Sequence, residues 1–201
     1  LKSKSCVVTG IDRRALADRS NYDSFYQLDL DTDRIDLDLK DYDYVLMLDI
    51  IEHLSNPEGF LDNLRDQFGL SQPTIILTTP NIAFFILRLQ LLIGNFNYGK
   101  QGILDITHKR LFTFKSLIKT CAQCGYLIGK VKGIPAPYPK AIGNNIFARF
   151  LLAINHFLIF FSKRIFSYQI YLEIKPTPVV SNLLEHSVTE SKKRSDKLVG
   201  E

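Results

Sequence analysis

The segment Asp41–Leu61 constrains the fold more than any other part of the chain. Its apolar run Tyr44–Leu48 is too short for a helix and has the length of a β-strand. A strand that is apolar throughout is typical of a sheet with both faces covered, so we expect this one to be buried on both sides. Polar residues follow it directly, and Asp49, Glu52 and His53 gather at its carboxyl end.

A capped helix follows this strand. Asn56 can accept a hydrogen bond at a helix start, and Pro57 occupies a position where no amide hydrogen is needed. The apolar positions 60, 61, 64 and 68 share one helix face, and Gly69 is placed to end the helix. A strand, a polar loop and a helix in this order are typical of an open α/β sheet, in which ligands bind outside the carboxyl ends of the strands.

Strand and helix patterns alternate along the rest of the chain. Apolar or β-branched runs predict strands at 6–12, 25–31, 73–79, 126–134 and 167–174. Helical patterns occur at 82–93, between Thr113 and Gly125, and at 146–165. We therefore predict one α/β domain over residues 1–178. The end of the chain is polar and mixed in charge, and we predict that residues 179–201 form a disordered tail.

Composition places the chain among ordinary globular proteins. It has 201 residues, 46% of them hydrophobic, and a net charge of +4. The basic residues form no stripe with interleaved aromatic residues, so we predict no nucleic-acid partner. Three cysteines without the spacing of a disulfide framework fit a reducing compartment, and we predict a cytoplasmic protein.

Three short segments resemble landmarks of one enzyme family: Leu48–Pro57, Thr78–Asn81 and Asp105–Thr113. In order and spacing they resemble the class I S-adenosylmethionine-dependent methyltransferases, of the ubiquinone-type, small-molecule branch. The resemblance extends over Cys6–Pro176. It implies a Rossmann-like sheet that ends in an antiparallel strand pair, S-adenosyl-L-methionine as cofactor, and methyl transfer to a small molecule, with O-methylation favoured.

The resemblance also assigns roles to acids that follow predicted strands. Asp12 would accept hydrogen bonds from the ribose hydroxyls of the cofactor, and Asp29, with Leu30 beside it, would lie near the adenine amino group. Asp31 is the alternative to Asp29. Asp49 would bind the cationic amino group of the methionine part. From the residues alone, Asp12 equally suits a nicotinamide-dependent dehydrogenase, or an exposed carboxylate that caps the next turn.

His53 and His108 are the candidate catalytic bases. An imidazole titrates near neutral pH, so it can take the proton of an attacking hydroxyl. Structural roles compete with catalysis, because His53 could fix the turn after the strand and His108 could make a contact near Arg110. Glu52 and Asp105 would add oxygen ligands to these imidazoles, but their spacing matches no known metal cage, and we predict no metal site.

The start of the chain departs from the family pattern. A class I methyltransferase begins with a strand and a glycine-rich turn, and Gly10, the one early glycine, lies inside the match to the second strand. The resemblance thus implies an N-terminally truncated sheet with an exposed apolar edge, and poor cofactor binding by this chain. Truncation of an active enzyme and decay to an inactive relative are the alternatives; the intact later motifs favour truncation and fusion to a larger chain.

The helix predicted over 146–165 supports a second hypothesis. Its polar residues Arg149, His156 and Lys163 recur every seven positions and leave a broad apolar face. With Arg164 next to Lys163, such a helix would suit a membrane surface or a partner protein. The alternative function is therefore a non-catalytic, methyltransferase-like module with peripheral membrane contact, although packing against the sheet would explain the same pattern.

Overall fold

A computed structural model describes residues 5–33, 35 and 37–199 of the chain. The chain forms two compact units, Leu1–Leu37 and Asp38–Glu201, which we call the N-terminal unit and the main unit. The sequence predicted one domain over residues 1–178, and that boundary stays a prediction.

The N-terminal unit contains a pair of parallel strands. Strand β1 (Thr9–Asp12) pairs with β2 (Ser24–Gln27), with Asp12 opposite Gln27. Both strands are shorter than the runs 6–12 and 25–31 that the sequence predicted. One reason is that the Val8 amide donates to a carboxylate oxygen of Asp23 at 2.8 Å rather than to a strand partner. Parallel strands end at the same edge of a sheet, so the residues after β1 and β2 lie together.

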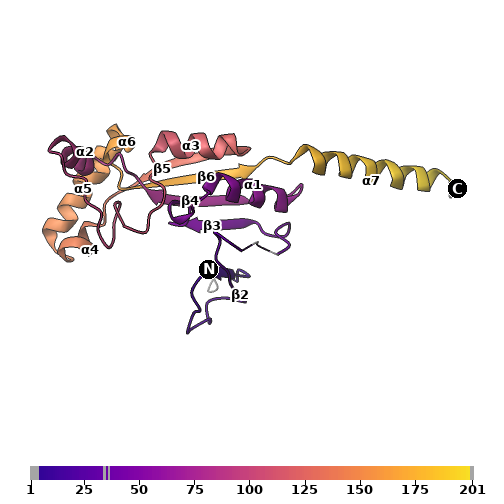
Figure 1. Cartoon of the computed structure of the whole chain (residues 1–201), viewed down its shortest axis with the longest axis horizontal. Coiled ribbons are helices and arrows are strands. Elements are labelled where there is room, and N and C mark those ends of the chain that lie inside the picture. The colour runs from indigo at the N-terminus through magenta and orange to yellow at the C-terminus, as the bar shows by residue number, and fades with distance from the viewer. Residues whose placement is uncertain (1–4, 34, 36, 200–201) are drawn as a thin grey trace. The chain divides into compact units, whose positions relative to one another are not determined.

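The main unit is built on a four-stranded sheet (Figure 1). Its strands are β3 (Tyr44–Leu48), β4 (Thr74–Pro80), β5 (Tyr126–Ile134) and β6 (Gln169–Pro176), in the order β3-β4-β6-β5. Strands β3 and β4 are parallel, whereas β6 runs antiparallel to both β4 and β5. The predicted α/β class and the terminal antiparallel pair are confirmed.

Strand β3 lies at the edge of this sheet, and one of its faces is exposed. Tyr44, Leu46 and Leu48 have exposed fractions of 63%, 43% and 52%, whereas Met47 is buried. The prediction that both faces of β3 are covered is therefore wrong. Side chains of a strand alternate between its faces, and among the described residues only the side with Met47 is turned into the core.

Two capped helices contribute to the core of the main unit. Helix α1 (Pro57–Phe68) starts where the Gly59 amide donates to the Asn56 side chain at 3.0 Å, and ends before Gly69, which has a φ of 61°. Helix α3 (Phe114–Gln123) starts at a capping box of Thr113 and Ser116. Both starts agree with the sequence. The core contains buried side chains of α1, α3 and the sheet, among them Leu61, Phe68, Ile75, Leu77, Leu117 and Leu172.

Four further helices gather at one end of the main unit (Figure 1): α2 (Phe85–Leu92), α4 (Tyr138–Ile142), α5 (Ile146–Phe161) and α6 (Lys163–Phe166). The helix predicted over 146–165 is interrupted, because Ser162 adopts an extended conformation between α5 and α6. Helix α2 is shorter than the predicted 82–93. The chain leaves β4 through a bridge between Asn81 and Phe112 before this helix begins.

A final helix, α7 (Val180–Val199), lies where the sequence predicted a disordered tail. The segment contains no glycine or proline, and local contacts support the helix. The Ser187 hydroxyl donates to the Leu183 carbonyl at 2.8 Å, and Lys193 lies 3.2 Å from the carboxylate of Glu190. Charge-mixed composition therefore did not distinguish a solvated helix from a disordered tail.

Candidate functional site

The strand-end acid Asp49 is held across three strands. Asp49 has a φ of 54°, a left-handed conformation that is uncommon outside glycine and turns its side chain away from the strand path. The Thr78 hydroxyl donates to its carboxylate at 2.9 Å, and the Gln169 amide donates to both of its oxygens at 2.9 and 2.8 Å. Strands β3, β4 and β6 thus join at this carboxylate, and its role in cofactor binding stays a prediction.

Glu52 is the most buried acid of the site. It lies on the short 3-10 helix η2 (Ile51–His53) with an exposed fraction of 1%. The Thr79 hydroxyl donates to its Oε2 at 2.9 Å, while Oε1 has no hydrogen-bond partner. Burial raises the pKa of Glu52 from 4.5 to about 7, and the charge of Asp49 adds to this rise. Sequence analysis did not place Glu52 at the centre of the site.

The backbone of Glu52 holds the second half of the site in place. Its carbonyl oxygen accepts hydrogen bonds from the amides of Lys109 and Arg110, at 2.9 and 3.0 Å. Arg110 also forms an ion pair with Glu58 of helix α1 at 2.6 Å. These contacts bring the segment around His108 against η2, more than fifty residues away along the chain.

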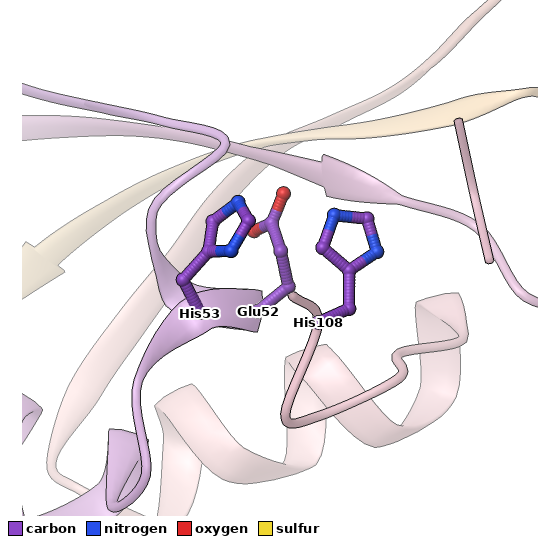
Figure 2. A group of neighbouring side chains, drawn as sticks. All are labelled: Glu52, His53 and His108. Carbon is purple, nitrogen blue, oxygen red and sulfur yellow. The ribbon is translucent and has the colours of Figure 1, made fainter. Parts of the chain in front are cut away.

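Backbone carbonyls orient both candidate bases. His108 Nδ1 lies 2.9 Å from the Ile103 oxygen, and His53 Nδ1 lies 3.2 Å from the Thr107 oxygen. Because a carbonyl oxygen only accepts, Nδ1 carries the proton in each neutral ring and Nε2 remains an acceptor. The ring centroids are 4.8 Å apart, and Figure 2 shows both rings beside the Glu52 carboxylate.

Glu52, His53 and His108 form a cluster in which one ligand atom of each lies within 4.8 Å of the other two. Within the described part of the chain, this is the one such group of three or more histidine, cysteine or acidic side chains. Two imidazoles and a carboxylate suit a divalent transition metal, and they equally suit a shared proton. The geometry thus supplies a ligand set that spacing had not revealed; the absence of a metal stays a prediction.

Asp105 does not belong to this cluster. Its carboxylate accepts hydrogen bonds from the Thr107 amide at 2.8 Å and from the Thr107 hydroxyl at 2.7 Å. These bonds hold the pKa of Asp105 below its usual value, with a smaller contribution from the charges of His108 and His53. Asp105 therefore shapes the turn that carries Thr107, and Thr107 in turn contacts the ring of His53.

The predicted adenosine contacts lie in the N-terminal unit. Asp12 ends β1 as expected, and its carboxylate accepts the Arg14 amide at 2.7 Å. Asp29 and Leu30 follow β2, and Asp29 lies 3.9 Å from the guanidinium of Arg13. Asp12 and Asp29 thus share the carboxyl edge of the parallel pair. The cofactor-binding roles of Asp12, Asp29 and Leu30 stay predictions.

No protein-family model and no curated protein sequence matches the chain. Its structure is similar to that of the small RNA methyltransferase HEN1, with a TM-score of 0.51 and 15% identity over 85% of this chain. The match spans only 20% of the HEN1 chain.

Two smaller methyltransferase structures match over most of both chains. One is an S-adenosylmethionine-dependent methyltransferase from Archaeoglobus fulgidus, with a TM-score of 0.50 and 16% identity over 88% of this chain and 78% of that one. The other is from Mesorhizobium loti, with a TM-score of 0.50 and 13% identity over 84% and 80% of the two chains. The sheet order, the terminal antiparallel pair and these similarities agree: the chain has the fold of the class I S-adenosylmethionine-dependent methyltransferases.

Proposed function

We propose that the protein is an S-adenosylmethionine-dependent methyltransferase that transfers a methyl group to an oxygen of a small-molecule acceptor. The observation that carries this proposal is the cluster of Glu52, His53 and His108, which lies just beyond the carboxyl end of β3 in a sheet of this fold. Ligands bind at this end of the strands in open α/β sheets. The cysteine content suits a reducing, cytoplasmic setting.

The residues of the main unit fit the charged part of the cofactor. S-adenosylmethionine supplies an electrophilic methyl group on a sulfonium, and its methionine part carries a cationic amino group. Asp49 offers a carboxylate that has hydrogen bonds from Thr78 and Gln169 but no ion pair within the described residues. An ionised carboxylate can accept about four hydrogen bonds, so an ammonium group can join these two donors.

The N-terminal unit would bind the nucleoside. Asp12 would accept the two ribose hydroxyls, and Asp29 and Leu30 would contact the adenine. The support for these roles is their position after parallel strands, at the edge where this fold class takes its ligands.

Proton removal is assigned to His108, with His53 as the alternative base. The Ile103 carbonyl keeps the Nδ1 proton of His108 in place, so Nε2 can take the proton of an acceptor hydroxyl. As that oxygen bonds to the methyl carbon, the carbon–sulfur bond breaks and its electron pair stays on sulfur. The products are the methylated acceptor, S-adenosylhomocysteine and a proton on the imidazole.

Cofactor titration of the intact gene product tests this proposal. We expect saturable binding of S-adenosylmethionine by calorimetry, and weaker binding in Asp49→Ala. Asp62→Ala on the surface of α1 serves as the matched control and should bind as the parent does. If the intact protein binds no S-adenosylmethionine, the alternative function of a non-catalytic methyltransferase-like module takes its place.

A further inference from the structure

Helix α5 presents a continuous apolar stripe to solvent. Its side chains at positions 147, 150, 154, 157 and 161 share one face, because they are spaced by three or four residues. All five are exposed, with fractions from 39% at Ile154 to 67% at Phe161. The helix is anchored by its opposite face, where Ala148 and Asn155 are buried. Asn155 accepts the Ala136 amide and donates to the Phe166 carbonyl, both at 2.8 Å.

Helix α2 lies at the same end of the main unit as α5 (Figure 1), and its segment adds exposed aliphatic side chains. Leu92 and Ile93 have exposed fractions of 81% and 73%. The rings of Phe85 on α2 and Phe166 on α6 lie 5.6 Å apart and link the two helical segments. We call the exposed apolar side chains of residues 86–93 and of α5 the α2/α5 surface. Exposed apolar side chains scattered singly are ordinary, whereas several along one helix face, as on α5, are typical of a contact surface.

The charge around the α2/α5 surface is predominantly positive. Between Gln67 and Leu172 the sequence contains one acid, Asp105, and twelve lysines and arginines. The helices and loops at this end of the main unit contain several of these cations and one acid, Asp105. The cations are Arg88, Lys100, Lys140, Arg149, Lys163 and Arg164.

Exposed apolar side chains with cations around them indicate which partner suits this surface. We propose that the α2/α5 surface docks the protein on a bilayer that contains anionic lipids. Phenylalanine, leucine and isoleucine side chains would enter the boundary of headgroups and acyl chains, while the surrounding cations would meet lipid phosphates and carboxylates. No helix within the described residues is long and apolar enough to cross a bilayer.

Two other occupants fit less well. A second copy of this chain would cover the apolar side chains, but it would bring two sets of cations together with few acids between them. Nucleic acid would neutralise the cations, and the exposed phenylalanines of α5 could stack on bases, but the aliphatic side chains of Leu89, Leu92 and Ile93 would gain no apolar partner. The proposal does not depend on methyltransferase activity, since neither the cluster nor Asp49 takes part in it.

Co-sedimentation of the full chain with vesicles tests the proposal. We expect the parent to sediment with phosphatidylcholine–phosphatidylserine vesicles and to stay in solution with phosphatidylcholine alone. The double substitution F157D/F160D should lower partitioning at least about tenfold, because it places charges in the apolar face. Reversal of charge at Lys163 and Arg164 should lower it about fivefold per residue. Val188→Asp, at an exposed apolar position of α7, is the matched control and should sediment as the parent does.

Circular dichroism and thermal unfolding confirm that each variant is folded. The proposal is overturned if the parent does not sediment with anionic vesicles, or if F157D/F160D and the parent sediment equally. Two further outcomes would overturn it. One is a concentration-dependent dimer that F157D/F160D dissociates in the absence of vesicle binding. The other is binding to a duplex or single-stranded RNA probe that removes the protein from vesicles and is insensitive to F157D/F160D.

Discussion

The carboxylate of Glu52 and the hydroxyl of Thr79 lie 2.9 Å apart in the core of the main unit, where this hydrogen bond reaches Oε2 of the buried carboxylate. The second oxygen of Glu52, Oε1, has no hydrogen-bond partner. The Glu52 side chain lies in the cluster with the imidazoles of His53 and His108. A buried acceptor without a partner costs about 1–3 kcal/mol. A proton or a metal cation on this oxygen would remove that cost.

The stability of the protein should fall as Glu52 ionises. Its folded pKa of about 7 lies above the ordinary 4.5, so the folded state binds the proton more tightly than the unfolded state. This stabilisation is fully present below pH 4.5 and is lost as the pH rises through 7. At roughly 1.4 kcal/mol per pKa unit, the loss is about 3 kcal/mol.

Glu52→Gln should remove this pH dependence, because a neutral amide keeps the hydrogen bond from Thr79 without ionising. Urea unfolding between pH 4 and 9, with a chelator present, measures the difference between the two proteins. Identical slopes for parent and variant over this range would contradict the assignment.

Substitution of His108 should lower turnover more than cofactor affinity. Loss of a general base costs about 10²–10⁴-fold in rate, and His108→Ala removes the ring without touching Asp49. Steady-state rates and calorimetric affinities for S-adenosylmethionine, measured on the intact gene product, separate the two effects. His156→Ala removes an exposed imidazole of α5 and should leave both unchanged. Equal losses in rate and affinity would show that His108 contributes to cofactor binding and not to the catalytic step.

Asp12→Ala should weaken the binding of S-adenosylmethionine roughly tenfold to a hundredfold, because it removes charge-assisted hydrogen bonds to the ribose. Asp18→Ala is a close control in the same unit. Asp18 accepts the amide of Ser20 at 2.8 Å, two residues ahead, as Asp12 accepts the amide of Arg14. Equal affinities of the parent and Asp12→Ala would disprove the assignment of β1 to ribose binding.

The cluster should bind a divalent cation, although its spacing in the sequence led us to predict no metal. Three acceptors converge there, and no donor satisfies Oε1 of Glu52. Cobalt(II) gives a visible absorption band that reports its ligands, and we expect saturable binding that His53→Ala abolishes. Asp105→Asn should still bind cobalt, because that side chain is directed to Thr107. A titration without a saturable band would agree with the prediction of no metal.

Asn155 should contribute to stability independently of the site. Its side chain is buried and connects the Ala136 amide to the Phe166 carbonyl. Asn155→Ala leaves both backbone groups without their partner, which should lower the free energy of unfolding by about 1–3 kcal/mol. Thermal unfolding measures this loss, and the exposed Asn144→Ala provides the control. A change below that of the control would show that water replaces the lost side chain.

The local parts of the fold were readable from the sequence because short-range hydrogen bonds determine them. Asn56 and Thr113 cap their helices through amides three residues away, and the bounds of β5 agree with the predicted 126–134. Strand lengths and the interruption at Ser162 were less predictable. They depend on which hydrogen-bond partners the folded chain offers to the backbone. The amide of Val8, for example, donates to the side chain of Asp23 and not to a neighbouring strand.

The sequence by itself determined the alternation of strands and helices, the acids that follow β1, β2 and β3, and the two histidines that could act as bases. Only the tertiary structure decided that Glu52 is buried between those histidines and that one face of β3 is exposed. It also decided that the Gln169 side chain donates hydrogen bonds to Asp49, 120 positions away in the sequence. Capping and periodicity act over a few residues, whereas burial and convergence depend on segments that meet only when the sheet has formed.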